Sequence, residues 1–268
     1  MRQVRIFFAY FAQYAMRRLA YKGDFFAEMF AGILGTAATL AFVLMLFYGA
    51  GVQAIGQWSR EQVLFIYGFT FIPFGLFNVL SLNLYQFSER YIIEGRFDRV
   101  LVRPLGTLPQ VMFESFRLQS LHEVAVGLVI ITLCAREMGT PLDAGDYGLI
   151  ALMGLGGFGV LMGVFLILVS ASFWFEDRIG IAPPVYNLIM FGRYPIDIYH
   201  QSLQFILKWI VPFGFIGFYP SARFIAGDKF GGDLRLAFLL TPVVGLFCLV
   251  LAFGVWTRGV RRYSSTGS

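Results

Sequence analysis

The sequence predicts an all-α protein whose helices cross a lipid bilayer several times. Hydrophobic residues make up 58% of the 268-residue chain and charged residues only 14%, whereas soluble domains average about 45–50% and about 25%. The mean hydropathy is +0.71. The apolar residues gather in runs long enough to cross the hydrocarbon core as helices.

The apolar runs predict six transmembrane helices in a single membrane domain, residues 23–268. An amphipathic helix at 1–22 is expected to lie on the membrane surface, because arginines flank its apolar side chains. The alternative for that segment is a short first span. The six spans are expected at 25–50, 62–86, 109–135, 147–173, 181–193 and 234–257.

Small residues recur every four positions in two predicted spans, and this spacing lets membrane helices approach closely. One series is Ala27, Ala31 and Gly35, and the other is Gly159 and Gly163. The second series overlaps a G-x-G-x-x-G pattern. That pattern lacks the preceding strand that a dinucleotide site needs, so helix packing is the better interpretation.

The segment before the last span is apolar but interrupted by Pro195, Pro212 and Pro220. Irregular backbone is tolerated at membrane depth where protein surrounds it, so residues 195–224 are predicted to form a re-entrant helical hairpin. The alternative is a full span at 203–219.

Six spans place both termini on one side, and the 21 Lys and Arg residues then divide about two to one in favour of that side. The positive-inside rule makes it the cytoplasmic side. A full span at 203–219 would move the C-terminal arginines outside, so the charge distribution favours the re-entrant interpretation.

The sequence lacks the motifs of several enzyme classes. No P-loop, H-E-x-x-H or G-x-S-x-G pattern is present. Cys134 and Cys248 lie within apolar runs, without the spacing of a metal site. Basic residues cluster between apolar runs rather than on one folded face, which argues against nucleic-acid binding. We therefore expect a chain without catalytic residues or bound metal.

Five ionisable residues lie in or near the predicted spans: Glu28, Glu114, Arg117, His122 and Glu123. Ionisable side chains inside a membrane are candidate functional residues. Glu114 and Arg117 are three positions apart and are expected to pair on one helical face. Glu28 is expected to pair with a basic residue of the surface helix. The alternative is that the group on the third span lies at a cytoplasmic helix end, outside the hydrocarbon.

The longest charged interruption, residues 87–108, mixes apolar and charged side chains. Residues 91–104 are predicted to form a short amphipathic cytoplasmic helix that docks on a partner, although a solvated loop fits the composition equally well. Within it, EGRFDRVLVRPLGTLP (94–109) is similar to the G-x-hydrophobic-D-x-x-L-x-R-P segment of type-2 ABC exporter permeases. The stretch 191–227 also resembles the segment before the final helix of that family.

These two segments, with an amphipathic N-terminal helix before six spans, resemble the permeases of bacterial type-2 ABC exporters that work beside a separate ATPase chain. The resemblance implies that residues 91–104 are the coupling helix, with Phe97 and Leu101 as apolar anchors and nearby arginines as steering charges. The residues expected to couple to the ATPase are Ile93, Glu94, Gly95, Arg96, Phe97, Asp98, Arg99, Leu101, Arg103 and Pro104.

The resemblance also implies two ATPase subunits that hold ATP and Mg²⁺, a second permease, identical or related, and a place among the lipids of the bacterial cytoplasmic membrane. The expected function is ATP-driven export of an amphipathic, lipid-like or drug-like compound. The alternative is a secondary transporter or channel driven by an ion gradient. Such proteins usually carry acidic residues at mid-membrane, and the second, fourth and sixth predicted spans lack a convincing one.

Overall fold

The computed structural model describes residues 12, 16, 22–175, 187–225 and 232–264. Residues 181–186 of the predicted fifth span, 181–193, lie outside the described residues, as does most of the N-terminal segment 1–22, so the count of six spans stays a prediction. Five helices in the described part are long and apolar enough to cross a membrane: Lys22–Gly49, Arg60–Leu80, Leu118–Glu137, Ala144–Phe173 and Leu236–Arg262.

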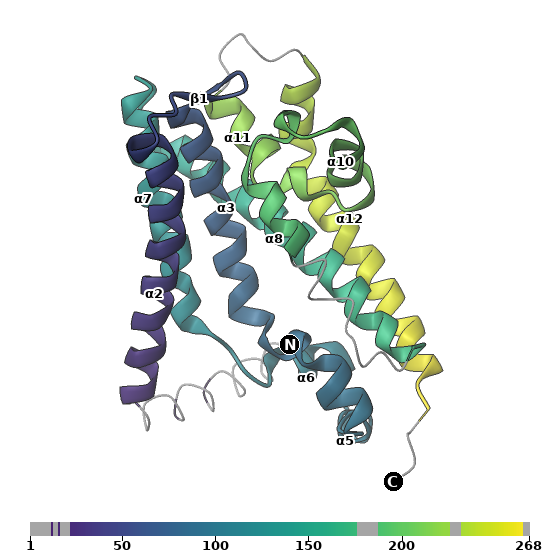
Figure 1. The fold of residues 1–268 in the computed structure, drawn as a ribbon. Helices are drawn as coiled ribbons and strands as arrows, with labels where there is room; N and C mark the ends of the chain where they lie inside the picture. The colour runs from purple at the N-terminus through teal and green to yellow at the C-terminus, as the bar shows by residue number, and fades with distance from the viewer. Residues whose placement is uncertain (1–11, 13–15, 17–21, 176–186, 226–231, 265–268) are drawn as a thin grey trace.

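The first two membrane helices are joined at one end of the molecule (Figure 1). Helix α2 (Lys22–Leu44) continues as a π-helical turn to Gly49. A short hairpin, β1 (Ala54–Ile55) and β2 (Trp58–Ser59), then leads into α3 (Arg60–Leu80). Ser59 and Gln62 form a capping box that fixes where α3 begins. Most of α3 is buried, so it is the central helix of the fold.

Short helical pieces follow α3 at the opposite end of the molecule (Figure 1). They are connected by tight turns and precede the next membrane helix. The pieces are α4 (Leu82–Tyr85), a π-helical turn (Phe87–Ile93), α5 (Phe97–Leu101) and α6 (Thr107–Phe113).

The predicted third span, 109–135, is not a single helix. It breaks after α6, and the membrane helix consists of a 3-10 turn (Leu118–Ser120) and α7 (Leu121–Glu137). Between them the chain crosses the end of α3, where the Arg117 N–H donates to the Val79 carbonyl at 3.0 Å. The prediction of one continuous helix was wrong because a tertiary contact, rather than a glycine or proline, accompanies the break.

Helices α8 (Ala144–Ser170) and α12 (Gly232–Arg262) lie side by side along the molecule (Figure 1). Their backbones touch at the glycines of α8. A methyl group on Gly159 would lie 2.9 Å from the Gly245 carbonyl oxygen, and one on Gly163 would lie 2.6 Å from the Cys248 carbonyl carbon. The other small-residue series, Ala27, Ala31 and Gly35, lies on an exposed face of α2.

The proline-rich segment consists of short helices near the end that carries β1 (Figure 1). No described helix runs through 203–219, because the chain leaves helical geometry at Val211; the alternative of a full span there is wrong. The segment is fastened by Asp197, which accepts hydrogen bonds from Trp58 Nε1 at 2.8 Å and Gln57 Nε2 at 2.6 Å.

The helices of this segment end or begin near the three prolines. Pro195 precedes a 3-10 turn, Pro212 follows a π-helical turn, and Pro220 lies in the first turn of the last helix. The pieces are 3-10 turns at Met190–Arg193, Ile196–Ile198 and Phe213–Phe215, α10 (Gln201–Phe205) with a π-helical turn (Ile206–Ile210), and α11 (Phe218–Ile225).

Candidate functional site

The charged loop predicted to couple to a partner lies at the end of the molecule opposite β1 and α11 (Figure 1). It is not one helix over 91–104. Gly95 adopts a φ of +67°, a left-handed conformation that favours glycine, and it separates the π-helical turn from α5. The loop therefore consists of two short helical pieces on either side of Gly95.

The core of this loop is aromatic. The side chain of Phe97 is 0% exposed, and its ring centroid lies 5.1 Å from that of Phe173 and 5.0 Å from that of Tyr263. With Phe87 and Trp256 these residues form what we call the aromatic cluster. The expectation that Phe97 is a docking anchor is wrong, because an amphipathic pattern does not tell whether the apolar face meets a partner or the chain itself.

Two buried side-chain amides hold the loop against its neighbours. Gln110 Nε2 donates to the carbonyls of Val100 and Leu105, both at 3.1 Å. Asn83 Nδ2 donates to the Val111 carbonyl at 2.8 Å, and its Oδ1 accepts from Ser115 Oγ at 2.7 Å. These bonds satisfy backbone carbonyls and connect α6 with α4, α5 and the turn at Leu105.

Glu114 belongs to this loop rather than to the membrane helix. One carboxylate oxygen accepts a hydrogen bond from the Tyr91 hydroxyl, and the other lies 3.6 Å from Arg90 Nη2. Burial and then the Glu114 carboxylate raise the pKa of Tyr91, so this hydroxyl remains a donor at neutral pH. The predicted Glu114–Arg117 pair is wrong because the intervening residues are not helical.

A set of exposed side chains faces away from the aromatic cluster. Val102 is 82% exposed and Leu101 is 44% exposed, and Ile93 is also exposed. The neighbouring Arg99 and Arg103 are exposed too. We call these five residues the coupling surface. The sequence did not single out Val102, since two consecutive apolar residues do not fit one face of an amphipathic helix.

The remaining residues of the predicted coupling set flank this surface. Arg96 and Glu94 form an exposed ion pair at 2.8 Å, and exposed pairs of this kind contribute little to stability. Pro104 is exposed after α5.

Asp98, also in the predicted coupling set, interacts with the aromatic cluster. Burial and the nearby Asp98 carboxylate raise the pKa of Tyr263 to about 12.

The other predicted polar residues meet between α2, α3 and α7. They line a cavity of about 390 Å³, which we call the polar pocket. Four of the five ionisable residues named from the sequence contribute to it, and Glu114 does not. The lining residues are Glu28, Gly32, Asn78, Tyr85, Gln86, Arg117, Gln119, Ser120, His122 and Glu123.

Hydrogen bonds hold the acidic groups of the polar pocket in place. Asn78 Nδ2 donates to both carboxylate oxygens of Glu123 at 3.0 Å, and Gln119 Nε2 donates to Glu28 Oε2 at 2.5 Å. His122 Nε2 lies 2.9 Å from Thr36 Oγ1. Its Nδ1 lies 2.6 Å from the Gln119 carbonyl oxygen, so both imidazole nitrogens are engaged within the protein.

The sequence placed the acidic residues in this region but missed the amides that orient them. Asn78 and Gln119 are uncharged, and a single amide in an apolar run does not predict a functional site. Most basic residues of the N-terminal segment, the expected partners of Glu28, lie outside the described residues.

A family model described as ABC-2 family transporter protein matches residues 34–267. The chain belongs to the ABC-2 transporter family. A search of curated proteins and a search of solved structures each gave no match. The matched residues include the coupling surface, the aromatic cluster and most of the polar pocket.

Membership assigns the chain a role as the membrane-spanning permease of an ABC transporter. ABC-2 permeases are the transport component, generally lack ATPase motifs, and associate with an ABC ATPase and typically with a partner permease. The apolar helices of this ABC-2 permease make it a membrane protein.

Proposed function

We propose that this ABC-2 permease exports an amphipathic or lipid-like compound, powered by ATP hydrolysis on a separate chain. The coupling surface is the observation that carries the proposal. Val102 and Leu101 project from a loop whose core is tightly packed. Exposed apolar side chains beside Arg99 and Arg103 suit a protein partner, because apolar anchors with a charged rim are typical of interfaces.

The aromatic cluster would transmit the movement of the ATPase. Phe97 belongs to α5, whereas Trp256 lies in the last turns of α12 and Tyr263 follows its end, so a force on α5 would act directly on a membrane helix. ATP and Mg²⁺ would bind to two ATPase subunits rather than to this chain. The exposed small-residue face of α2 supports a second permease, identical or related, that packs in the membrane.

The predicted sidedness fits this arrangement. The coupling surface and the described C-terminal residues lie at the same end of the molecule (Figure 1). This end would face the cytoplasm of a bacterium, with both termini inside, and the polar pocket would be reached from within the bilayer or from that side. A compound with a polar group and an apolar body would then suit the passage.

Affinity purification tests the association. We expect the tagged full-length chain, extracted from its native membrane, to retain a P-loop ATPase identified by mass spectrometry. Val102→Glu should reduce the retained ATPase at least about tenfold, since it places a carboxylate in an apolar contact. Ala54→Glu is the matched control, because Ala54 is also exposed but lies in β1 at the other end.

Inverted membrane vesicles test the direction. ATP should drive accumulation of a fluorescent amphipath inside them, and Val102→Glu should abolish it. Equal ATPase retention by the Val102→Glu variant and wild type would refute the coupling surface. Transport that needs no ATPase and stops with a protonophore would favour the ion-gradient alternative.

A further inference from the structure

Arg193 places a positive charge inside the membrane part of the fold. It ends the 3-10 turn Met190–Arg193, and its guanidinium carbon lies 4.7 Å from the ring centroid of Phe74 and 5.7 Å from that of Phe71. Both rings belong to the second half of α3, about 17–21 Å from its first residue at 1.5 Å per residue.

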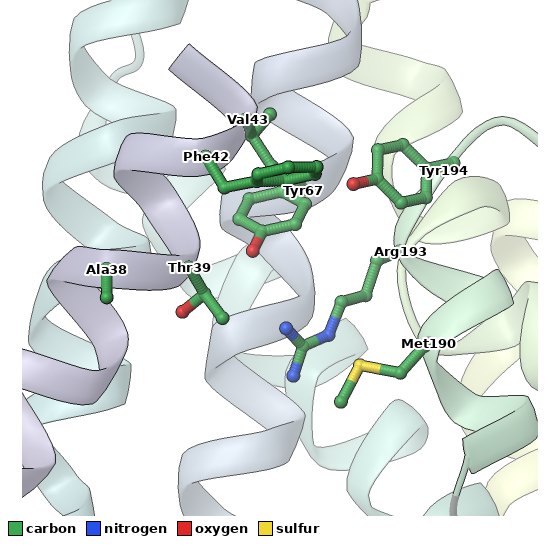
Figure 2. Close-up of a pocket in the computed structure, with 8 residues that line it drawn as sticks. All are labelled: Ala38, Thr39, Phe42, Val43, Tyr67, Met190, Arg193 and Tyr194. Carbon is green, nitrogen blue, oxygen red and sulfur yellow. The ribbon is translucent and has the colours of Figure 1, made fainter. Parts of the chain in front are cut away.

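The guanidinium lines a cavity of about 350 Å³ between α2, α3 and the 3-10 turn, which we call the arginine pocket. Figure 2 shows the Arg193 side chain reaching into this space, with the hydroxyl groups of Tyr67 and Tyr194 pointing toward it. Helix α2 contributes a mainly apolar wall. The full lining is Ala38, Thr39, Phe42, Val43, Tyr67, Met190, Arg193 and Tyr194.

Three donors of the arginine pocket have no acceptor among the described residues, whereas Thr39 Oγ1 donates to the carbonyls of Gly35 and Thr36 at 2.9 Å. Within the described part of the chain, the buried Nε of Arg193 has no hydrogen-bond partner and its guanidinium forms no ion pair. The hydroxyls of Tyr67 and Tyr194 likewise have no hydrogen bond to a described residue. A charged group in a membrane is costly unless it is paired. The aromatic rings and the electrostatic interaction of Arg193 with the Glu123 carboxylate compensate only part of that cost.

We propose that the arginine pocket binds the anionic group, a carboxylate or phosphate, of an amphipathic molecule. A guanidinium matches both groups because its planar fork donates two parallel hydrogen bonds. The tyrosine hydroxyls add donors, and Phe42, Val43 and Met190 offer apolar contacts to the rest of the molecule. The interpretation of the arginine pocket as a transport site rests on the proposed export function. The pocket would narrow the substrate class to anionic amphipaths, because Arg193 would repel a cationic one.

Equilibrium binding of radiolabelled dodecyl phosphate tests this site. The full-length permease is placed in nanodiscs of zwitterionic phosphatidylcholine. We expect saturable binding that Arg193→Gln weakens at least about tenfold, because charge-assisted hydrogen bonds are lost. Arg193→Lys should lie in between, since it keeps the charge without the fork. Dodecyltrimethylammonium, a cation with the same chain length, should not compete.

Arg223→Gln is the matched control and should bind as wild type does. Arg223 also lies over an aromatic ring, 6.0 Å from the centroid of Phe238, but it lines neither pocket. If Arg193→Gln does not fold, Tyr194→Phe supplies the answer: it keeps the ring, removes one donor, and should weaken binding a few-fold.

Two results would overturn the proposal. One is wild-type affinity in a folded Arg193→Gln variant, or in Tyr194→Phe where Arg193→Gln does not fold. The other is competition by dodecyltrimethylammonium as effective as that by unlabelled dodecyl phosphate. Displacement by phosphatidylglycerol would identify a lipid headgroup as the source of the anion, and failure to displace would identify a single-chain amphipath. The assay needs no ATPase, so a negative result leaves the coupling experiment to decide the export function separately.

Discussion

At the scale of single residues, Phe97 and Leu101 show how one amphipathic stretch serves two surfaces. They are four positions apart in α5, yet Phe97 is enclosed by the aromatic cluster and Leu101 is exposed. A side chain's effect on stability follows its burial, whereas its effect on partner binding follows its exposure. Substitutions at these two residues therefore distinguish an effect on folding from an effect on coupling.

We expect Phe97→Ala to lower the stability of the permease by about 3–5 kcal/mol, the usual cost of removing a buried aromatic ring. Leu101→Ala should change it by less than about 1 kcal/mol, because little of the lost contact is internal. Thermal unfolding of the purified variants measures both effects, and ATPase retention measures coupling. Equal melting temperatures for the two variants would contradict the assignment of Phe97 to the core.

The sequence could point to candidate functional residues only where their side chains are ionisable. It pointed to Glu28, His122 and Glu123, because charges stand out in apolar runs. It did not single out Arg193, which ends the predicted fifth span and lines the arginine pocket. Which ring covers a guanidinium, or which helix covers Phe97, depends on contacts between residues distant in sequence.

At the scale of elements, long apolar runs were sufficient to predict α2, α3, α8 and α12, because only helices satisfy the backbone inside a membrane. Broken elements were not predictable in the same way. The interruption before α7 is held by the Arg117 to Val79 contact, and the turn at Gly95 depends on a left-handed backbone.

The contact between α8 and α12 offers a prediction at this scale. Gly163→Ala should lower the melting temperature by several degrees, since the added methyl group would meet backbone atoms near Cys248 that cannot move aside. Gly148→Ala in the same helix is the control: nothing lies within 4 Å of the added group, and alanine favours a helix. A larger loss in Gly148→Ala than in Gly163→Ala would disprove close packing at this interface.

At the scale of the whole molecule, the coupling surface and the β1–β2 hairpin occupy opposite ends (Figure 1). This separation makes sidedness testable with thiol labelling. The native Cys134 and Cys248 are both buried, so an introduced cysteine at an exposed position would dominate the reaction with a maleimide that cannot cross membranes.

We expect Val102→Cys to react only in inverted vesicles and Ala54→Cys only in intact cells. Both positions are exposed, so reactivity reports which side of the membrane each one faces. Cys-free protein with both native cysteines changed to alanine gives the background. Labelling of Val102→Cys in intact cells would reverse the proposed orientation and would place the coupling surface out of reach of a cytoplasmic ATPase.

The glycine contacts between α8 and α12 also limit how this molecule can move. Backbones that interlock at Gly156, Gly159 and Gly163 resist sliding, so the two helices would pivot together like a single lever. A helix the length of α8, 27 residues, is about 40 Å long. A push on α5 that rotates this lever by about 3° would displace its far end by about 2 Å over that length, comparable to the helix shifts that switch other proteins between states.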